Sequence, residues 1–229
     1  MSTAIDNSRR FGEGPLSRAA ARIYTVLVVE LLLLATAAPG LVPLVLLDRD
    51  ASNAPLAAIC ALPLGPAVSA ALYALHHHRS DLADLSPAAA FVRGYRTNVG
   101  GVLRMWVPWL AWLTVLTLNL AYLPAAGVPS WWAVAMVILA VAAILWVTNA
   151  LVITSLFAFR VRDIARLAVY FLVRTPRVTL GNACLLIVAA GVTMLWSEAV
   201  LALLGAVFVS ALLLNARPMT TTIQEQFTA

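Results

Sequence analysis

Six long apolar stretches constrain this sequence more than any other feature. A transmembrane helix needs about 20 mainly apolar residues, because the hydrocarbon core is roughly 30 Å thick and lipid offers the backbone no hydrogen bonds. Of the 229 residues, 62% are hydrophobic and 11% are charged, whereas about 25% are charged in an average soluble domain. We therefore predict an all-α, polytopic membrane helix bundle. Its six transmembrane helices form three hairpins and are expected at about 23–47, 55–75, 102–123, 131–157, 178–196 and 198–215.

Arginine supplies all fifteen cationic side chains and predicts the orientation of the spans. With the N-terminus inside, fourteen arginines fall on the cytoplasmic side and only Arg49 falls outside. The positive-inside rule then predicts a multi-pass protein of the bacterial inner membrane with both termini cytoplasmic. We expect a cytoplasmic N-terminal segment at 1–22, a membrane domain at 23–217 and a cytoplasmic tail at 218–229. Because orientation explains the arginines, no nucleic-acid partner is expected.

Two cytoplasmic segments carry a basic amphipathic pattern. Ser86 and Pro87 predict a helix start, since a hydroxyl residue suits the N-cap and proline the first helical position. That helix would cover 88–98, and the second segment covers 160–174. Each segment could simply extend a neighbouring span; we favour an interfacial helix for the first and leave both interpretations open for the second. Interfacial helices would contact anionic lipid headgroups through Arg93, Arg96, Arg162 and Arg166.

The first hairpin is irregular in sequence. Pro39 and Pro43 are expected to end or kink the first helix early, because proline removes a backbone donor and clashes with the preceding turn. The stretch 62–66 contains two prolines and a glycine, which predicts a broken second span whose regular part begins near Pro66. If the first pair of stretches were re-entrant, the chain would have only four or five spans.

The same stretch carries a family resemblance. Leu62–Ala67 resembles the proline–glycine–proline signature of the YesL-like family of bacterial integral membrane proteins, and the stretches 91–98 and 174–180 resemble two further segments of that family. Members of this family are often linked with carbohydrate-uptake and carbohydrate-degradation gene clusters. The resemblance therefore implies an accessory role beside a sugar transporter, whose subunits or further copies of this chain would be partners. The positions that carry the signature are Pro63, Gly65, Pro66, Ala67, Arg96, Asn98 and Pro176.

One carboxylate is expected inside the membrane. Glu30 lies about seven residues into the first span, roughly 10 Å deep. A carboxylate at that depth is costly and usually faces protein or water, which makes it a candidate for function. Polar residues in the same inner half of the membrane could complete a small-solute site or a proton-accessible cavity, with Arg104 reaching inward from the inner mouth of the third span to pair with Glu30. The alternative is a glutamate that merely ties helices together. The candidate layer consists of Glu30, Ser69, Tyr73, Arg104, Asn149 and Asn182.

The sequence gives catalysis little support. The run His76 to His78 looks like a metal ligand set, but consecutive helical positions point about 100° apart and cannot converge on one ion. We find no nucleotide, phosphate-loop, zinc-protease or nucleophile motif, so we predict no metal, no cofactor and no enzymatic activity. The favoured function is a membrane protein accessory to carbohydrate uptake. The alternative is a stand-alone transporter or channel for a small solute, using the polar layer around Glu30.

Overall fold

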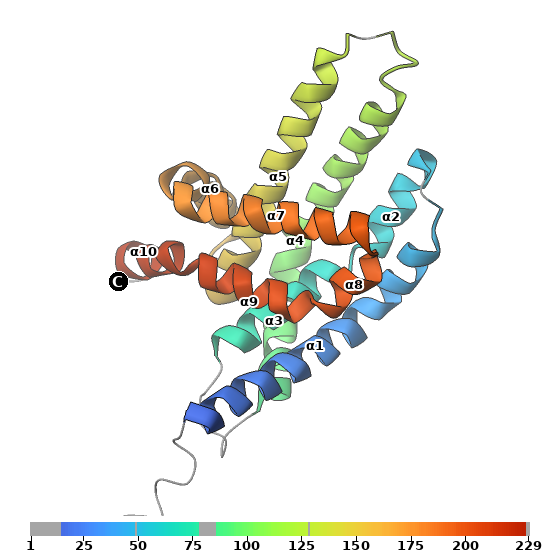
Figure 1. Cartoon of the computed structure of the whole chain (residues 1–229). Helices are drawn as coiled ribbons and strands as arrows, with labels where there is room; N and C mark the ends of the chain where they lie inside the picture. The colour runs from blue at the N-terminus through green and yellow to red at the C-terminus, as the bar shows by residue number, and fades with distance from the viewer. Residues whose placement is uncertain (1–14, 49, 78–85, 128, 228–229) are drawn as a thin grey trace, which may run out of the picture.

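A computed structural model describes residues 15–48, 50–77, 86–127 and 129–227 (Figure 1). Over these residues the chain is helical and has no strand, so the predicted all-α fold is confirmed. The described elements are α1 (Pro15–Leu46), η1 (Ala51–Asn53), α2 (Ala54–Cys60), α3 (Leu64–His76), α4 (Pro87–Tyr122), α5 (Trp131–Leu156), α6 (Val161–Arg174), α7 (Pro176–Leu195), α8 (Glu198–Leu203), α9 (Gly205–Asn215) and α10 (Arg217–Phe227).

Several of these helices are long and apolar enough to cross a membrane. By length and composition, α1, α4, α5 and α7 each qualify alone. Two bent pairs raise the possible number to six: η1 and α2 with α3, bent by 43°, and α9 with α10, bent by 50°. The described part of the chain is thus compatible with a multi-pass membrane protein of four to six spans.

Helix α3 lies at the centre of the bundle, packed against α1, α4, α5 and α9. Most of its residues are buried, and the buried ones are mainly small, including Gly65, Ala67, Ser69, Ala70 and Ala71. Small side chains allow helices in a membrane to approach closely, where van der Waals contact replaces the hydrophobic drive available in water. The many contacts of α3 therefore follow from its composition.

The break before α3 occurs where the prolines predict it. Helix α2 ends at Cys60 and α3 begins at Leu64, so residues 61–63 interrupt the predicted second span. The break frees backbone carbonyls, and the indole N–H of Trp106 donates a 3.0 Å hydrogen bond to the carbonyl of Ala61. A side chain of α4 thus satisfies one backbone group that the interrupted helix leaves open.

The first helix corrects an expectation. Helix α1 runs without interruption to Leu46, with Pro39 and Pro43 inside it, so the prolines do not end the helix early and its end agrees with the predicted span 23–47. Prolines are tolerated in membrane helices where neighbouring helices support the freed backbone. Here Gly40 is buried against the last turn of α2, close to the carbonyl of Cys60, which holds this part of α1 in place.

The first basic segment also differs from expectation. Residues 88–98 are not a separate interfacial helix but the beginning of α4, which continues to Tyr122. Phe91 is only 1% exposed, and Gly94 lies against the ring of Tyr73 on α3. This segment therefore buries one face on protein instead of lying on lipid. The second basic segment does form its own helix, α6.

The C-terminal part is more divided than expected. The predicted sixth span, 198–215, is interrupted at Leu204 into α8 and α9, and most of the predicted tail belongs to α10. In Figure 1 the α4–α5 hairpin extends away from the other helices, while α6 and α10 lie at the opposite side of the view from α2. The N-terminal part of α5 exposes apolar side chains such as Val134 (61%) and Ile138 (63%), whereas the last third of the helix is buried.

Candidate functional site

Three asparagines form a hydrogen-bonded chain across α5, α7 and α9. The side chain of Asn215 donates to Asn182 at 2.8 Å, and Asn182 donates to Asn149 at 3.0 Å. Asn215 also donates to the backbone carbonyl of Val178 at 2.8 Å. Asn149 and Asn182 are almost completely buried. The asparagine chain therefore links three apolar helices through amide groups that would otherwise lack partners.

Sequence reasoning missed Asn215, although the sequence contained a signal. Asn182 follows Asn149 by 33 residues, and Asn215 follows Asn182 by 33 residues. The signal is that one asparagine recurs at equal spacing in three successive apolar stretches. The close approach also depends on Gly181, since a Cβ atom there would lie 2.1 Å from the side-chain oxygen of Asn215.

Glu30 lies at the break between α8 and α9. One carboxylate oxygen accepts a hydrogen bond from the backbone N–H of Ala206, in the first turn of α9. The first N–H groups of a helix have no intrahelical acceptor, and the helix dipole attracts negative charge to that end. Among the described residues the other oxygen of Glu30 is buried without a hydrogen-bond partner. This geometry is the one expected of a glutamate that ties helices together.

The remaining candidates of the polar layer lie elsewhere. The hydroxyls of Ser69 and Ser155 are 2.8 Å apart between α3 and α5. The ring of Tyr73 stacks on His77 at 4.1 Å. Arg104 is exposed on α4 and lines a groove beside α5 and α6. Of the six predicted residues, only Asn149 and Asn182 share a hydrogen bond within the described part of the chain, and the proposed pairing of Arg104 with Glu30 is absent from the described contacts.

The signature residues are spread over α3, α4 and α7. Gly65 faces the indole of Trp106, so that a Cβ atom there would lie 2.7 Å from the ring. Ala67 is fully buried, and Pro176 is the first residue of α7. Asn98 donates to the backbone carbonyl of Ser155 at 3.2 Å. The exposed arginines of this set and of the predicted lipid contacts are Arg93, Arg96, Arg162 and Arg166.

A mainly apolar cavity of about 450 Å³ lies between α1, α3, α4, α5, α7, α8 and α9. Its few polar lining residues include Asn182 of the asparagine chain, Thr148 and Glu198. Gly205, beside the Glu30 carboxylate, also lines it. Sites for small molecules are usually cavities of this size, lined by apolar side chains with a few polar groups. We call this the central cavity.

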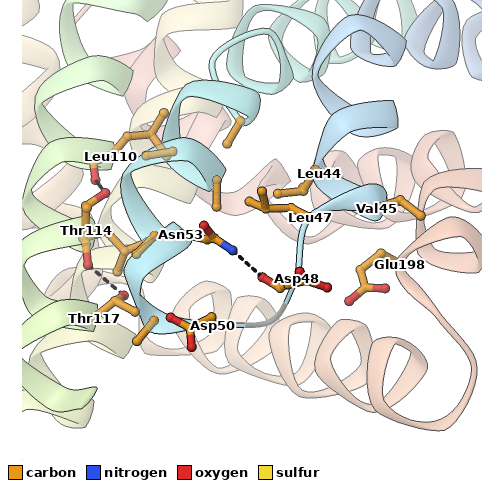
Figure 2. Close-up of a pocket in the computed structure, with 16 residues that line it drawn as sticks. Leu44, Val45, Leu47, Asp48, Asp50, Asn53, Leu110, Thr114, Thr117 and Glu198 are labelled. Carbon is orange, nitrogen blue, oxygen red and sulfur yellow. Dashed lines mark hydrogen bonds between the residues drawn. The ribbon is translucent and has the colours of Figure 1, made fainter. Parts of the chain in front are cut away.

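A second pocket, of about 490 Å³, adjoins the central cavity and shares Leu44 and Glu198 with it. Figure 2 shows Glu198 on one side of this acidic pocket and Thr114 and Thr117 on the opposite side. Asp48 and Asp50 also line it. Hydrogen bonds donated by the side chain and backbone of Ser52 lower the pKa of Asp50, which therefore stays ionised at neutral pH.

The described histidines and carboxylates do not gather into a metal site. Over the described ranges no group of three or more His, Cys, Asp or Glu side chains could hold a metal ion. His76 and His77 lie with their ring centres 5.2 Å apart at the end of α3. His78 of the histidine run and Arg49, between the two aspartates of the acidic pocket, lie outside the described residues.

The chain was compared with protein-family models, with curated proteins and with solved structures, and none of them matches it.

Proposed function

We propose that the chain crosses the inner membrane of a bacterium six times, with both termini in the cytoplasm. The four long helices supply four crossings, and α2 with α3 supplies another. For the last crossing we take α8 with α9, which together cover the predicted stretch 198–215, in place of the bent pair α9 and α10. The support for the orientation is the arginine distribution, with fourteen arginines on the proposed inner side and one on the outer side. In this arrangement α6 lies at the cytoplasmic interface and the acidic pocket opens outward.

Reporter fusions test this topology. Alkaline phosphatase fused after Ala126, in the α4–α5 connection, is expected to be active, because its disulfides form only outside the cytoplasm. The same reporter fused after Phe159, in the α5–α6 connection, is expected to be at least tenfold less active at equal expression. A fluorescent protein that folds only in the cytoplasm provides the matched control and should give the reverse pattern. Equal phosphatase activity at the two sites would refute the proposed arrangement.

The favoured function is a non-catalytic accessory protein of a carbohydrate uptake system. The observation that carries the non-catalytic part is the use of polar side chains within the bundle. The asparagines bond one another across three helices, and one of the two carboxylate oxygens of Glu30 bonds a helix end. Groups engaged in this way support a fixed scaffold more readily than a reaction. The link to carbohydrate rests on the resemblance of the stretch 62–67 to YesL-like proteins.

The second candidate is a small-solute transporter, and the two adjoining cavities favour it. The acidic pocket would form the outer entrance, and the central cavity would hold the solute beside Glu30 and Asn182. Glu198 lines both cavities and would stand at the passage between them. This candidate requires that the helices around the central cavity separate toward the cytoplasm during transport.

One pair of measurements separates the two candidates. Affinity purification from cells grown on the relevant sugar is expected to recover transporter subunits with the tagged chain, while the purified chain alone moves no sugar in vesicles. Recovery of no transporter subunit under any sugar would refute the accessory role. Solute uptake by vesicles that contain only this chain, and its loss in Glu30→Gln, would establish the second candidate instead.

A further inference from the structure

An apolar groove of about 600 Å³ runs between α4, α5 and α6. One face of α4 forms its floor, from Arg104 through Trp109 to Trp112. Two indole N–H groups fix its walls: Trp109 donates to the carbonyl of Ala143 on α5, and Trp146 donates to the carbonyl of Ala165 on α6, both at 3.1 Å. Because three helices are tied together in this way, the groove is already formed without a ligand.

The charge of this groove is concentrated at one end. Of the described residues that line it, only Arg104 is charged, and it is the lining residue of α4 closest to the N-terminus of that helix. The groove extends along α4 from Arg104 to Trp112, a rise of about 12 Å. The groove therefore has one exposed guanidinium at its end and an apolar length that is sufficient for about half of an acyl chain.

Helix α6 adds positive charge next to the same groove. Val161 and Ala165 line the groove, and the exposed Arg162 and Arg166 each follow one of them, turned by about 100° around the helix. These arginines lie on the side of α6 away from its buried residues. Asp163, also exposed, is turned a further 100° or so from the groove. The groove is thus bordered by arginine rather than by carboxylate.

The geometry points to a specific binding site for one anionic phospholipid, with an acyl chain in the groove and the phosphate at Arg104. An arginine guanidinium binds phosphate with two parallel hydrogen bonds, and basic pockets between membrane helices suit anionic headgroups. The tryptophan, methionine and leucine side chains of the groove form an apolar surface that the acyl chain would contact. The assignment of this lipid to the inner leaflet rests on the topology proposed above, whereas the binding itself does not.

Native mass spectrometry of the full chain, released from detergent micelles, tests the proposal. Phosphatidylglycerol and phosphatidylcholine with identical acyl chains are added in turn, and bound lipid is counted. Wild type is expected to retain phosphatidylglycerol preferentially. Arg104→Gln should lower that preference about fivefold, the effect of about one arginine near an anionic headgroup. Arg177→Gln is the matched control, because Arg177 is exposed on α7 and does not line the groove. It should change nothing.

A second variant tests the apolar part of the site. Ala142 lines the groove and is exposed, so the phenylalanine side chain of Ala142→Phe should fill the groove without entering the protein core. It is expected to lower retention of long-chain phosphatidylglycerol several-fold, with the thermal stability of the protein unchanged. Glycerol phosphate, which has the headgroup chemistry but no chain, should not displace the lipid.

Three outcomes would overturn the site. They are equal retention in Arg104→Gln and Arg177→Gln, unchanged retention in Ala142→Phe, and displacement of the lipid by glycerol phosphate. A lipid-free dimer as the main species would show instead that a second copy covers the groove. Reporter fusions with reversed activity would remove only the leaflet assignment and leave the retention data intact, so the two failures are distinguishable.

Discussion

Gly40→Ala is expected to destabilise the bundle more than any other change of comparable size. Gly40 is buried in α1, and an added Cβ would lie 1.9 Å from the backbone carbonyl oxygen of Cys60. A backbone atom cannot rotate away as a flexible side chain can, so α1 and α2 must separate. Overpacking of this kind costs typically 1–3 kcal/mol, and we expect about 3 kcal/mol here. Thermal unfolding in detergent, followed by circular dichroism, measures the loss.

Gly191→Ala provides the matched control. Gly191 also lies inside an apolar helix, α7, but nothing surrounds its added Cβ within 4 Å. Because alanine favours helix over glycine by about 1 kcal/mol, this variant should be neutral or slightly more stable than wild type. Equal unfolding temperatures for Gly40→Ala and Gly191→Ala would contradict the close contact between α1 and α2.

The features that depend on local sequence could be predicted. Apolar stretches of membrane-spanning length predict α1, α4, α5 and α7, because the length and hydropathy of a helix decide whether it can cross the hydrocarbon core of a membrane. The two prolines around Gly65 likewise anticipate the break before α3, because the loss of backbone donors is a local effect.

The features that depend on neighbouring helices could not be predicted. The prolines of α1 are the same residue type as those before α3, yet α1 continues through them, because Gly40 packs against α2. Residues 88–98 have an interfacial pattern, yet their buried residues Phe91 and Gly94 face protein. In each case a tertiary contact, invisible in a single sequence, decides between two conformations that the local pattern allows.

The candidate site likewise has features that the local sequence predicts and features that depend on neighbouring helices. The depth of Glu30 in the apolar stretch indicated a group that needs a partner, and in the structure the N–H of Ala206, 176 residues away, bonds it. The break at Leu204 frees this backbone N–H group, and the amino-acid composition of the stretch does not reveal such a break. Asn149 and Asn182 are grouped by their predicted place in the inner half of the membrane and do meet, whereas Ser69, Tyr73 and Arg104 have other neighbours.

Asn182→Leu should produce the largest loss among the polar substitutions, because Asn182 is the middle member of the asparagine chain. Leucine removes the donor to Asn149 and the acceptor of Asn215 together. The amide oxygen of Asn149 is then left buried without that donor, and an unsatisfied buried polar group costs about 1–3 kcal/mol. We expect a loss of about 2 kcal/mol, measured by thermal unfolding in detergent. Asn119→Leu is the control, since Asn119 is exposed and bonds only within α4, to the carbonyl of Val115.

A double-mutant cycle tells whether the asparagines act as one unit. Removal of one partner strands the other, whereas removal of both strands neither, and Asn215 keeps its hydrogen bond to the carbonyl of Val178. Asn149→Leu combined with Asn182→Leu should therefore cost less than the sum of the single changes. Residues in one hydrogen-bonded network typically differ from additivity by about 0.5–3 kcal/mol. Additive losses, or a loss for Asn182→Leu no greater than for Asn119→Leu, would mean that apolar packing alone holds α5, α7 and α9 together. Non-additive losses would instead mean that the hydrogen bonds between these amides fix the alignment of the three helices. Shape and hydrophobicity specify that alignment poorly in a lipid environment.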